Sequence, residues 1–272
     1  MTRPPHGRIQ AVLLAALLGC AALGLVSARA PGQKKRPTQT KLEAKGGPAE
    51  TSVPFRAGER LNYRVLWSTF SVNAARVRLS VTERGPFYGR EAWHFQARAH
   101  TVDAMRLIFA LDDQFDSYTE PGSLASLQYE MYLREQGKKE DAIFRMSAEG
   151  DPAPGVGSAV RVLPGTRDPL GFLFYLRAVD WQRSKEVGSP VFDGRKLYQV
   201  RARLALARGE VTVPAGKFTA CRIEVRVFER GKELEQTRFS VWLAQDASRT
   251  PLLLEAEVPL GSARVELTRA EH

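Results

Sequence analysis

Apolar side chains recur at every second position in several long runs of this chain, and this spacing restricts its fold more than any other feature. Leu61, Ala75, Trp93, Tyr198 and Ala263 each open one such run, and polar residues such as Arg, Glu, Gln, Ser and Thr fill most positions between. Successive side chains of a strand point to opposite faces of its sheet. The pattern therefore predicts antiparallel strands with one buried and one solvated face.

Short turn sequences separate the runs. Glycine tolerates the positive φ of hairpin turns, and four segments contain it at such places: Arg84-Gly85-Pro86, Gln136-Gly137-Lys138, Asp193-Gly194 and Arg230-Gly231-Lys232. We expect about 12–14 strands in one antiparallel β domain over residues 53–270. A flat sheet of that size would expose long edges. The predicted fold is therefore all-β, as a large antiparallel curled sheet or barrel, or as two packed sheets.

One segment departs from the alternation and predicts a helix. Asp168 can cap free backbone amides, Pro169 suits a first helical turn, and mostly apolar residues continue to Val179. Because apolar side chains cover most of its circumference, we expect this helix to be buried. Two roles follow. It fills the core of the sheet, or its aromatic residues line a pocket for an apolar ligand; these residues are Phe172, Phe174 and Tyr175.

Residues 1–30 have the layout of a bacterial export signal, in which positive charge precedes an apolar run. Arg3 and Arg8 come before a run from Ile9 to Val26, and residues 31–52 are rich in Pro, Gly, Lys, Thr and Gln. The second stretch has too few apolar side chains to offset the entropy of ordering, so we interpret it as a disordered tether. The signal predicts export to the periplasm or outer membrane of a Gram-negative bacterium.

The processing of this signal has three alternatives. Leu17-Leu18-Gly19-Cys20 resembles a lipobox, which would make Cys20 a lipidation site, whereas Ala28 and Ala30 mark places for ordinary cleavage. The apolar run continues past Cys20, which favours secretion. An uncleaved anchor is the third route, because about 18 apolar residues is the lower limit for spanning a bilayer. We expect membrane association only through this N-terminus.

The formal charge of +10 is concentrated near the N-terminus. Residues 1–47 contain eight Lys or Arg and one Glu, a net charge of +7, which leaves +3 for the remainder. On the predicted strands Arg and Glu interleave, as in Arg222, Glu224 and Arg226. A nucleic-acid surface needs clustered positive charge on the domain itself. We therefore expect no nucleic-acid partner.

The predicted domain contains few residues suited to catalysis or metal binding. His94 and His100 fall on the polar side of one strand about 20 Å apart, too far to share a metal, and we interpret both as surface histidines. The chain has no serine nucleophile elbow, zinc-protease helix, phosphate loop or Cys-x-x-Cys pair. We expect no catalytic residue, metal or cofactor.

Two further groups of residues have a structural interpretation. Asp112, Asp113 and Asp116 form the densest acidic group, which we interpret as a polar strand edge, and Cys221 falls on the apolar side of its strand as a small buried residue. A glycosidase pair of carboxylates leaves no local signal, since its members come from distant strands.

Five segments of the chain resemble one known family. The sequence is similar to the bacterial envelope family catalogued as domain of unknown function 3108, over nearly all of residues 53–269. This resemblance implies an exported, mostly β protein without an assigned catalytic site. The segments are Phe55-x-x-Gly58-Glu59-x-Leu61-x-Tyr63-x-Val65-x-Trp67, Asp113-x-x-x-Ser117-Tyr118, Asp168-Pro169-Leu170 to Arg177, Val213 to Phe218 with Cys221-Arg222-Ile223-Glu224, and Trp242-Leu243-Ala244-x-Asp246 before Pro251.

Three functions fit these observations. The first is a non-enzymatic module of the cell envelope that binds an apolar or lipid-like molecule in the concavity of its sheet, or another envelope protein on its surface. The second is a structural or protein-interaction module without a ligand. The third is a carbohydrate-directed enzyme that uses carboxylates brought together by folding.

Overall fold

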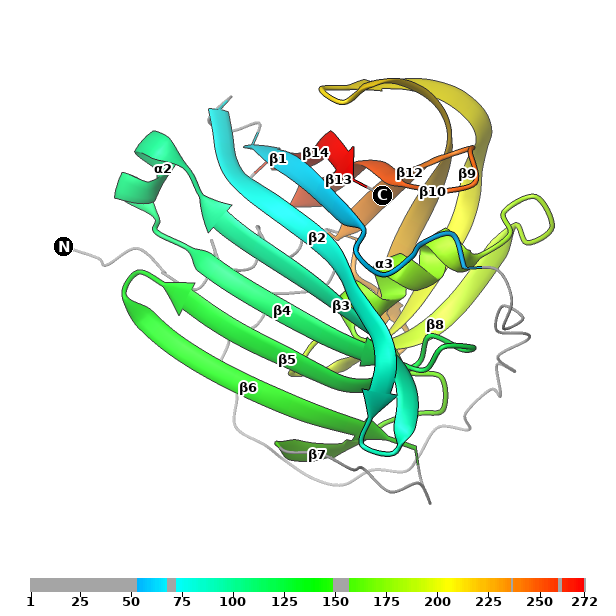
Figure 1. Ribbon diagram of the computed structural model, residues 1–272. Helices are drawn as coiled ribbons and strands as arrows, with labels where there is room; N and C mark the ends of the chain where they lie inside the picture. The colour runs from blue at the N-terminus through cyan, green and yellow to red at the C-terminus, as the bar shows by residue number, and fades with distance from the viewer. Residues whose placement is uncertain (1–52, 68–71, 149–156, 236, 259–260, 272) are drawn as a thin grey trace.

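The computed structural model describes residues 53–67, 72–148, 157–235, 237–258 and 261–271 (Figure 1). The described elements are two helices and fourteen strands. In chain order they are β1 (Arg60–Trp67), β2 (Val72–Phe87), β3 (Arg90–Thr101), α2 (Asp103–Ile108), β4 (Asp112–Thr119), β5 (Ser126–Glu135), β6 (Lys138–Ser147), β7 (Ser158–Arg161), α3 (Pro169–Ala178), β8 (Glu186–Phe192), β9 (Leu197–Val213), β10 (Gly216–Glu229), β11 (Lys232–Glu233), β12 (Arg238–Ala244), β13 (Pro251–Val258) and β14 (Gly261–Glu271).

All fourteen strands belong to one curled sheet. Its order is β7-β6-β5-β4-β3-β2-β1-β14-β13-β12-β10-β9-β8, and β11 pairs with β10 outside this path. Neighbouring strands are antiparallel except for β6 and β7. Most strands that are neighbours in the sheet are also consecutive in the chain. The pairing of β1 with β14 brings the two ends of the described domain together. The predicted class and strand number are confirmed.

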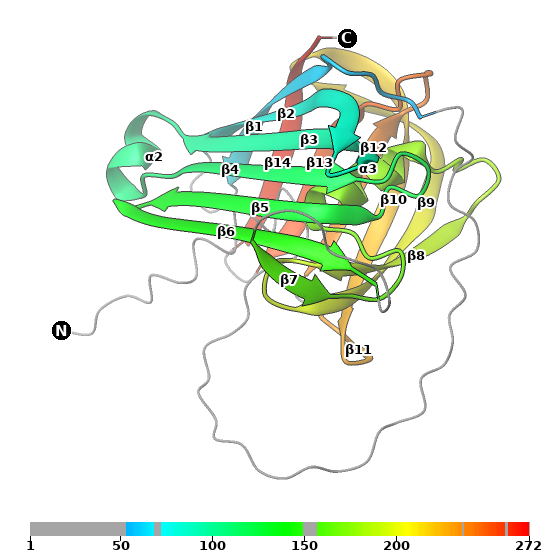
Figure 2. The same ribbon diagram turned by 60° about the horizontal axis from the view of Figure 1, so that its bottom comes forward.

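The segment between β7 and α3 bridges the two edges of this sheet. Next to the edge strand β7, the Val162 amide donates to the Ser147 carbonyl of β6 at 2.9 Å. At the β8 edge, the Arg167 amide donates to Pro190, and the Phe192 amide donates to the Arg167 carbonyl at 2.9 Å. Figure 2 shows the side of the molecule on which β6, β7 and β8 lie. The strand ladder stays open, and the connecting chain joins its ends.

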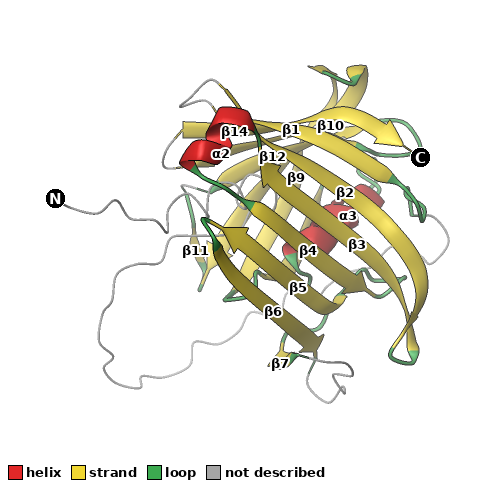
Figure 3. Cartoon of the chain, turned by 60° about the vertical axis from the view of Figure 1, so that its left-hand side comes forward, coloured by secondary structure: helices red, strands yellow, loops and turns green. Residues whose placement is uncertain are grey.

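Helix α3 lies inside the curl, between the two halves of the sheet (Figures 1 and 3). All ten of its residues are buried. Asp168 caps the helix, since its Oδ1 accepts from the Gly171 amide at 2.9 Å, and Pro169 starts the first turn. A Cβ on Gly171 would lie 3.0 Å from Ser126 Oγ, so glycine permits the close approach of this turn to the sheet. The predicted helix is confirmed.

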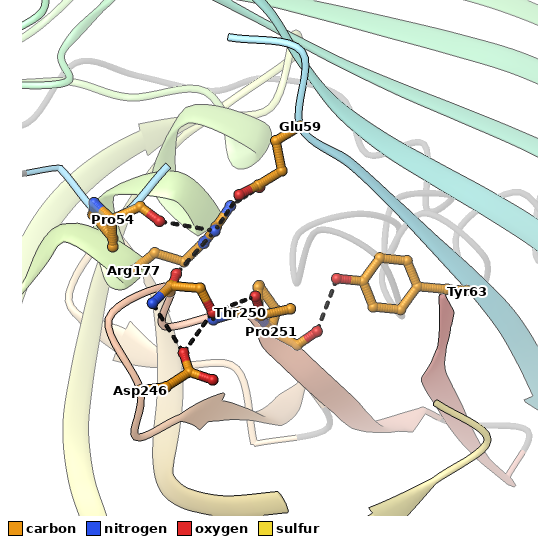
Figure 4. A network of polar contacts seen from close by, with 8 residues as sticks. Pro54, Glu59, Tyr63, Arg177, Asp246, Thr250 and Pro251 are labelled. Atoms are coloured by element: carbon orange, nitrogen blue, oxygen red, sulfur yellow. Dashed lines mark hydrogen bonds and ion pairs between the residues drawn. The ribbon is translucent and has the colours of Figure 1, made fainter. Parts of the chain in front are cut away.

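A buried ion pair fixes the other end of α3, and Figure 4 shows its surroundings. Arg177 Nη1 lies 2.6 Å from Glu59 Oε1, and both side chains are almost completely buried. Arg177 Nη2 also donates to the carbonyls of Pro54 at 3.4 Å and Ser248 at 3.0 Å. The contacts tie the helix to the segment that enters β1 and to the β12–β13 connection.

Three of the four predicted turns are confirmed. Gln136-Gly137 and Arg230-Gly231 have positive φ at both residues, and Gly194 has a φ of 92° between β8 and β9. The fourth prediction is wrong, because Arg84-Gly85-Pro86 belongs to β2. The turn lies instead at Tyr88-Gly89, where φ is 46° and 81°.

The position of Pro86 explains this difference. Strand β2 pairs with β1 only up to Ser80, while its pairing with β3 continues to Phe87. The last residues of β2 therefore have a neighbour on one side only. Proline lacks the amide donor of a ladder and is tolerated at such a free strand edge.

The predicted export signal (1–30), the tether (31–52) and Cys20 lie outside the described residues and stay predictions, as does the extent of the domain at 53–270. Neither helix of the described part has the length and apolar character needed to cross a bilayer.

Candidate functional site

A polar groove runs over the outer face of β3, β4 and β5. It has a volume of about 530 Å³. Its side chains stand at alternate strand positions, opposite the core residues Phe95, Phe115 and Tyr129 on the same strands. We call this hollow the outer groove. It is lined by His94, Gln96, Asp112, Gln114, Asp116, Tyr118, Glu130, Tyr132 and Arg134.

Asp116 is the centre of a hydrogen-bond network in the outer groove. Its Oδ1 lies 2.7 Å from His94 Nε2 and accepts from Gln96 Nε2 at 2.9 Å, while Oδ2 accepts from Gln114 Nε2 at 2.6 Å. Burial acts to raise the pKa of Asp116, but the hydrogen bonds from His94, Gln114 and Gln96 outweigh it and lower this pKa. Asp116 is therefore a fixed, ionised acceptor.

His94 differs from its predicted place on the protein surface. Only 14% of its side chain is exposed, and it bonds to Asp116 on the neighbouring strand. His100 is exposed, as predicted, and does not line the outer groove. The two histidines therefore belong to different environments.

A second carboxylate faces Asp116 across the β4–β5 pair. Glu130 is the direct cross-strand partner of Asp116, and Cβ atoms of such partners lie about 5 Å apart. Tyr132 donates to Glu130 Oε2 and Gln128 donates to Oε1, each at 2.5 Å. The bond to Glu130 is the largest cause of the raised pKa of Tyr132. Both carboxylates are thus positioned by neighbouring donors before any ligand arrives.

Aromatic rings extend the outer groove toward the β2–β3 hairpin. Tyr118 stacks on His94 with ring centroids 4.4 Å apart, and on Phe87 with centroids 4.3 Å apart. Burial, together with nearby carboxylates such as Glu130, raises the pKa of Tyr118 to about 12. The phenol therefore keeps its proton and can donate a hydrogen bond.

The acidic group on β4 is divided between the two faces of the sheet, and the predicted polar strand edge is wrong. Strand β4 lies between β3 and β5, inside the sheet. Asp112 is exposed and pairs with Arg106, Asp116 belongs to the outer groove, and Asp113 points to the buried side. Adjacent residues of a strand cannot share a face, so the cluster in the sequence is not a cluster in space.

Asp113 forms a buried carboxyl pair with Glu135 of β5. Burial is the main cause that raises the pKa of Asp113 to about 6 and that of Glu135 to about 8, and the nearby charge of Asp113 adds to the rise at Glu135. Such pairs hold one proton between them because two adjacent charges repel. Both side chains are buried and neither lines the outer groove, so this pair lies on the opposite face of the sheet from a ligand bound there.

The Asp113–Glu135 pair predicts a pH-dependent stability. Because the pKa of Glu135 is raised in the folded state, its stabilising effect is complete below the unfolded value near 4.5 and is lost as pH rises to about 8. Between pH 5 and 8, the free energy of unfolding should fall by about 2 kcal/mol less in Glu135→Gln than in the wild type. Urea denaturation at each pH measures this difference. The exposed Glu186→Gln on β8 is the matched control, because Glu186 is not among the charges that act on Glu135. Equal slopes in wild type and Glu135→Gln would contradict the shared proton.

The aromatic residues of α3 pack in the core. Phe174 stacks on Phe95 with centroids 3.8 Å apart, and the Arg167 guanidinium lies 3.6 Å above the ring of Tyr175. A second hollow, of about 210 Å³, lies between the β2–β3 hairpin, the β4–β5 connection and residues 162–166. Neither this hollow nor the outer groove is lined by Phe172, Phe174 or Tyr175. Their role as ligand-lining residues stays a prediction.

Cys221 is a buried free thiol, and burial raises its pKa. This environment fits a small core residue, because reactive thiols need a lowered pKa. In the described part of the chain, no three His, Cys, Asp or Glu residues are grouped so that they could hold a metal ion.

A family model described as "Protein of unknown function (DUF3108)" matches residues 62–268. This range contains all nine residues of the outer groove. The chain belongs to the DUF3108 family. The resemblance seen in the sequence is therefore confirmed, and the curated proteins contain no match to the chain.

Two solved structures show what this DUF3108 chain is similar to. A β-barrel-like protein with domain of unknown function DUF1849 from Brucella abortus is 11% identical, with a TM-score of 0.50 over 80% of this chain and 98% of that one. A Parabacteroides distasonis protein predicted to be a lipoprotein is 8% identical, with a TM-score of 0.35 over 84% of this chain and 100% of that one. At this identity the Brucella structure bears on the curled β architecture alone.

Proposed function

We propose that this DUF3108 chain is a non-enzymatic binding module of the bacterial cell envelope, and that its outer groove binds a polyhydroxylated ligand such as an oligosaccharide. The observation that carries the proposal is the pair of cross-strand carboxylates, Asp116 and Glu130, each fixed by donors from neighbouring side chains. We propose export from the signal-like residues 1–30, with lipidation at Cys20, cleavage at Ala28 or Ala30, or an uncleaved anchor as its alternatives.

The chemistry of the outer groove suits a ligand with many hydroxyl groups. Carboxylate oxygens accept hydrogen bonds from hydroxyls, while amides such as Gln96 and the phenol of Tyr118 both donate and accept. The acceptors are held in place by the protein, so binding costs little side-chain entropy. An apolar ligand would leave the polar groups of this lining without hydrogen-bond partners, and the buried side chains of α3 lie on the other side of the sheet.

The same groups argue against glycoside hydrolysis. A glycosidase needs one carboxylic acid with a raised pKa to protonate the leaving oxygen. Asp116 has a lowered pKa, and Glu130 already accepts hydrogen bonds from Gln128 and Tyr132. Four described carboxyls have raised pKa values, and all are buried and outside the outer groove: Asp113, Glu135, Asp168 and Asp193. The arrangement therefore favours binding over catalysis.

Titration of the full chain with neutral oligosaccharides tests this proposal. We use chitohexaose, cellohexaose and maltohexaose as probes and follow backbone amide shifts by NMR. At least one probe is expected to bind with shifts concentrated on β3, β4 and β5, and Asp116→Asn is expected to weaken it about tenfold, since a charged hydrogen-bond acceptor is lost.

Glu224→Gln is the matched control, because Glu224 is an outer-face carboxylate on β10 that pairs with Arg203. It should leave the affinity unchanged. Absence of binding by all three probes, or shifts concentrated on α3, would overturn the proposal.

A further inference from the structure

We infer that the outer face of β1, β2 and β3, together with the exposed tip of α2, docks this protein onto an anionic phospholipid surface. Five side chains form the first part of this surface, which we call the arginine patch. They are Arg64, Arg76, Arg78, Arg98 and His100.

The register of the strands places like charges against one another. Arg64 lies directly opposite Arg76 across the β1–β2 pair, and Arg78 lies directly opposite Arg98 across the β2–β3 pair. Arg76 is also opposite His100. Directly opposed like charges destabilise a sheet, so this arrangement costs stability unless an anion lies over it.

The described residues neutralise this patch only in part. Arg64 is 2.8 Å from Glu266, and Arg78 donates to the neutral side chain of Asn62 at 3.0 Å. No carboxylate in the described ranges lies within ion-pair distance of Arg76 or Arg98. The patch therefore presents an excess of positive charge to solvent.

The outer face of β9 and β10 provides the contrast. There Arg203 pairs with Glu224 at 3.0 Å and Arg226 lies 3.7 Å from Glu233. Arg226 is also directly opposite Arg201, whose guanidinium lies 5.1 Å from the ring of Phe228. Arg203 and Arg226 therefore differ from Arg76 and Arg98 in having an acidic neighbour within ion-pair distance.

The second part of the surface is α2, which directly follows β3 (Figures 1 and 3). Leu107 is 90% exposed and Ile108 is 63% exposed, the highest values among the large apolar side chains described. The helix itself is anchored, because Met105 packs with Trp67 and Ala74 in a small apolar cluster. Its two exposed side chains are therefore held outward at the end of the sheet.

An ion pair connects the two parts. Arg106 of α2 pairs with Asp112, and Asp112 is the cross-strand partner of His100 in the arginine patch. The apolar tip and the basic residues consequently belong to one continuous region. Arginines beside exposed Leu and Ile side chains match the two layers of a membrane surface, anionic headgroups and acyl chains.

This contact differs from the membrane association predicted for the N-terminus, and it rests on other residues than the proposed ligand site. Leu107, Ile108 and the five residues of the arginine patch do not line the outer groove, although Arg98 lies opposite the groove residue Gln114. A soluble anion would need the arginines but not the exposed side chains of α2, whereas a phospholipid surface would need both. Variants of the two parts therefore distinguish these two sources of negative charge.

Vesicle sedimentation with the full chain tests the inference. The probes are phosphatidylcholine vesicles with and without phosphatidylglycerol, in low and high salt. We expect more of the chain to bind the anionic vesicles than the neutral ones, and salt to reduce this difference because the headgroup attraction is screened. Arg76→Gln/Arg98→Gln should reduce partitioning about tenfold, and Leu107→Ser/Ile108→Ser should reduce it by a similar factor.

Arg203→Gln/Arg226→Gln is the matched control, since it removes the same charge from the outer face of β9 and β10. It should change partitioning less than about twofold. The N-terminal segment is identical in all variants, so its own attraction cancels from the comparison. Equal losses in the control and the patch variant, no effect of Leu107→Ser/Ile108→Ser, or displacement by soluble glycerol phosphate would each overturn the inference.

Discussion

Arg177→Ala is expected to lower the free energy of unfolding by about 3–5 kcal/mol, because it leaves a buried carboxylate without its partner. The Arg177 guanidinium contacts both carboxylate oxygens of Glu59, at 2.6 and 3.1 Å, and also donates to two backbone carbonyls (Figure 4). Its centre lies 5.4 Å from the ring of Phe55 and 5.3 Å from that of Phe174. Removal of the side chain therefore affects charge, hydrogen bonds and packing together.

Urea denaturation of three variants separates these contributions. Glu59→Gln/Arg177→Met removes both charges and keeps most of the volume, so we expect it to cost less than half as much as Arg177→Ala. Arg183→Ala is the control, since Arg183 lies on the surface, and its cost should stay within about 0.5 kcal/mol. A double variant as unstable as Arg177→Ala would show that the lost hydrogen bonds of Arg177, and not the uncompensated charge, dominate.

This ion pair also marks the limit of what the sequence could predict. Glu59 and Arg177 are 118 positions apart, and neither forms a local motif. The helix around Arg177 was predictable because its signals are local: Asp168 supplies the cap, Pro169 the first turn, and the apolar residues follow. The burial of an arginine at its end depends on a partner that only the tertiary fold brings near.

The outer groove was not predictable for a related reason. Its residues occupy the alternate positions of β3, β4 and β5 that face away from the core. Polar residues at such positions normally indicate a solvated face. The sequence therefore does not predict that His94 of β3 forms a hydrogen bond with Asp116 of β4. The register that sets Asp116 opposite Glu130 depends on the pairing of β4 with β5, which the alternation alone does not determine.

The overall curl was predictable, but its closure was not. Fourteen strands with alternating burial require a curved sheet. The bridge between its edges depends on backbone hydrogen bonds of residues 162–167, a stretch without a periodic pattern. Likewise, the turn predicted at Pro86 is wrong because the free edge of β2 beyond Val81 is a property of strand pairing, which the local sequence does not contain.

Phe174→Ala is the second variant for which we expect a large effect, a loss of about 3–5 kcal/mol in the free energy of unfolding. Phe174 is buried, lies parallel to Phe95 with centroids 3.8 Å apart, and meets the edge of Phe55 at 5.2 Å. The variant loses the free energy gained by burying the ring, and the cavity left behind adds to the loss of stability. Tyr88→Ala, at an exposed turn, is the control and should cost less than about 1 kcal/mol.

The same variant distinguishes a packed interior from a ligand pocket lined by α3. If the ring of Phe174 fills space that no ligand occupies, truncation creates an apolar cavity. Benzene should then stabilise Phe174→Ala against thermal unfolding but leave the wild type unchanged. If the interior instead holds an apolar ligand, the wild type should itself be stabilised by such compounds, and the loss in Phe174→Ala should be smaller. That result would contradict a binding site in the outer groove and would indicate one in the concavity of the sheet.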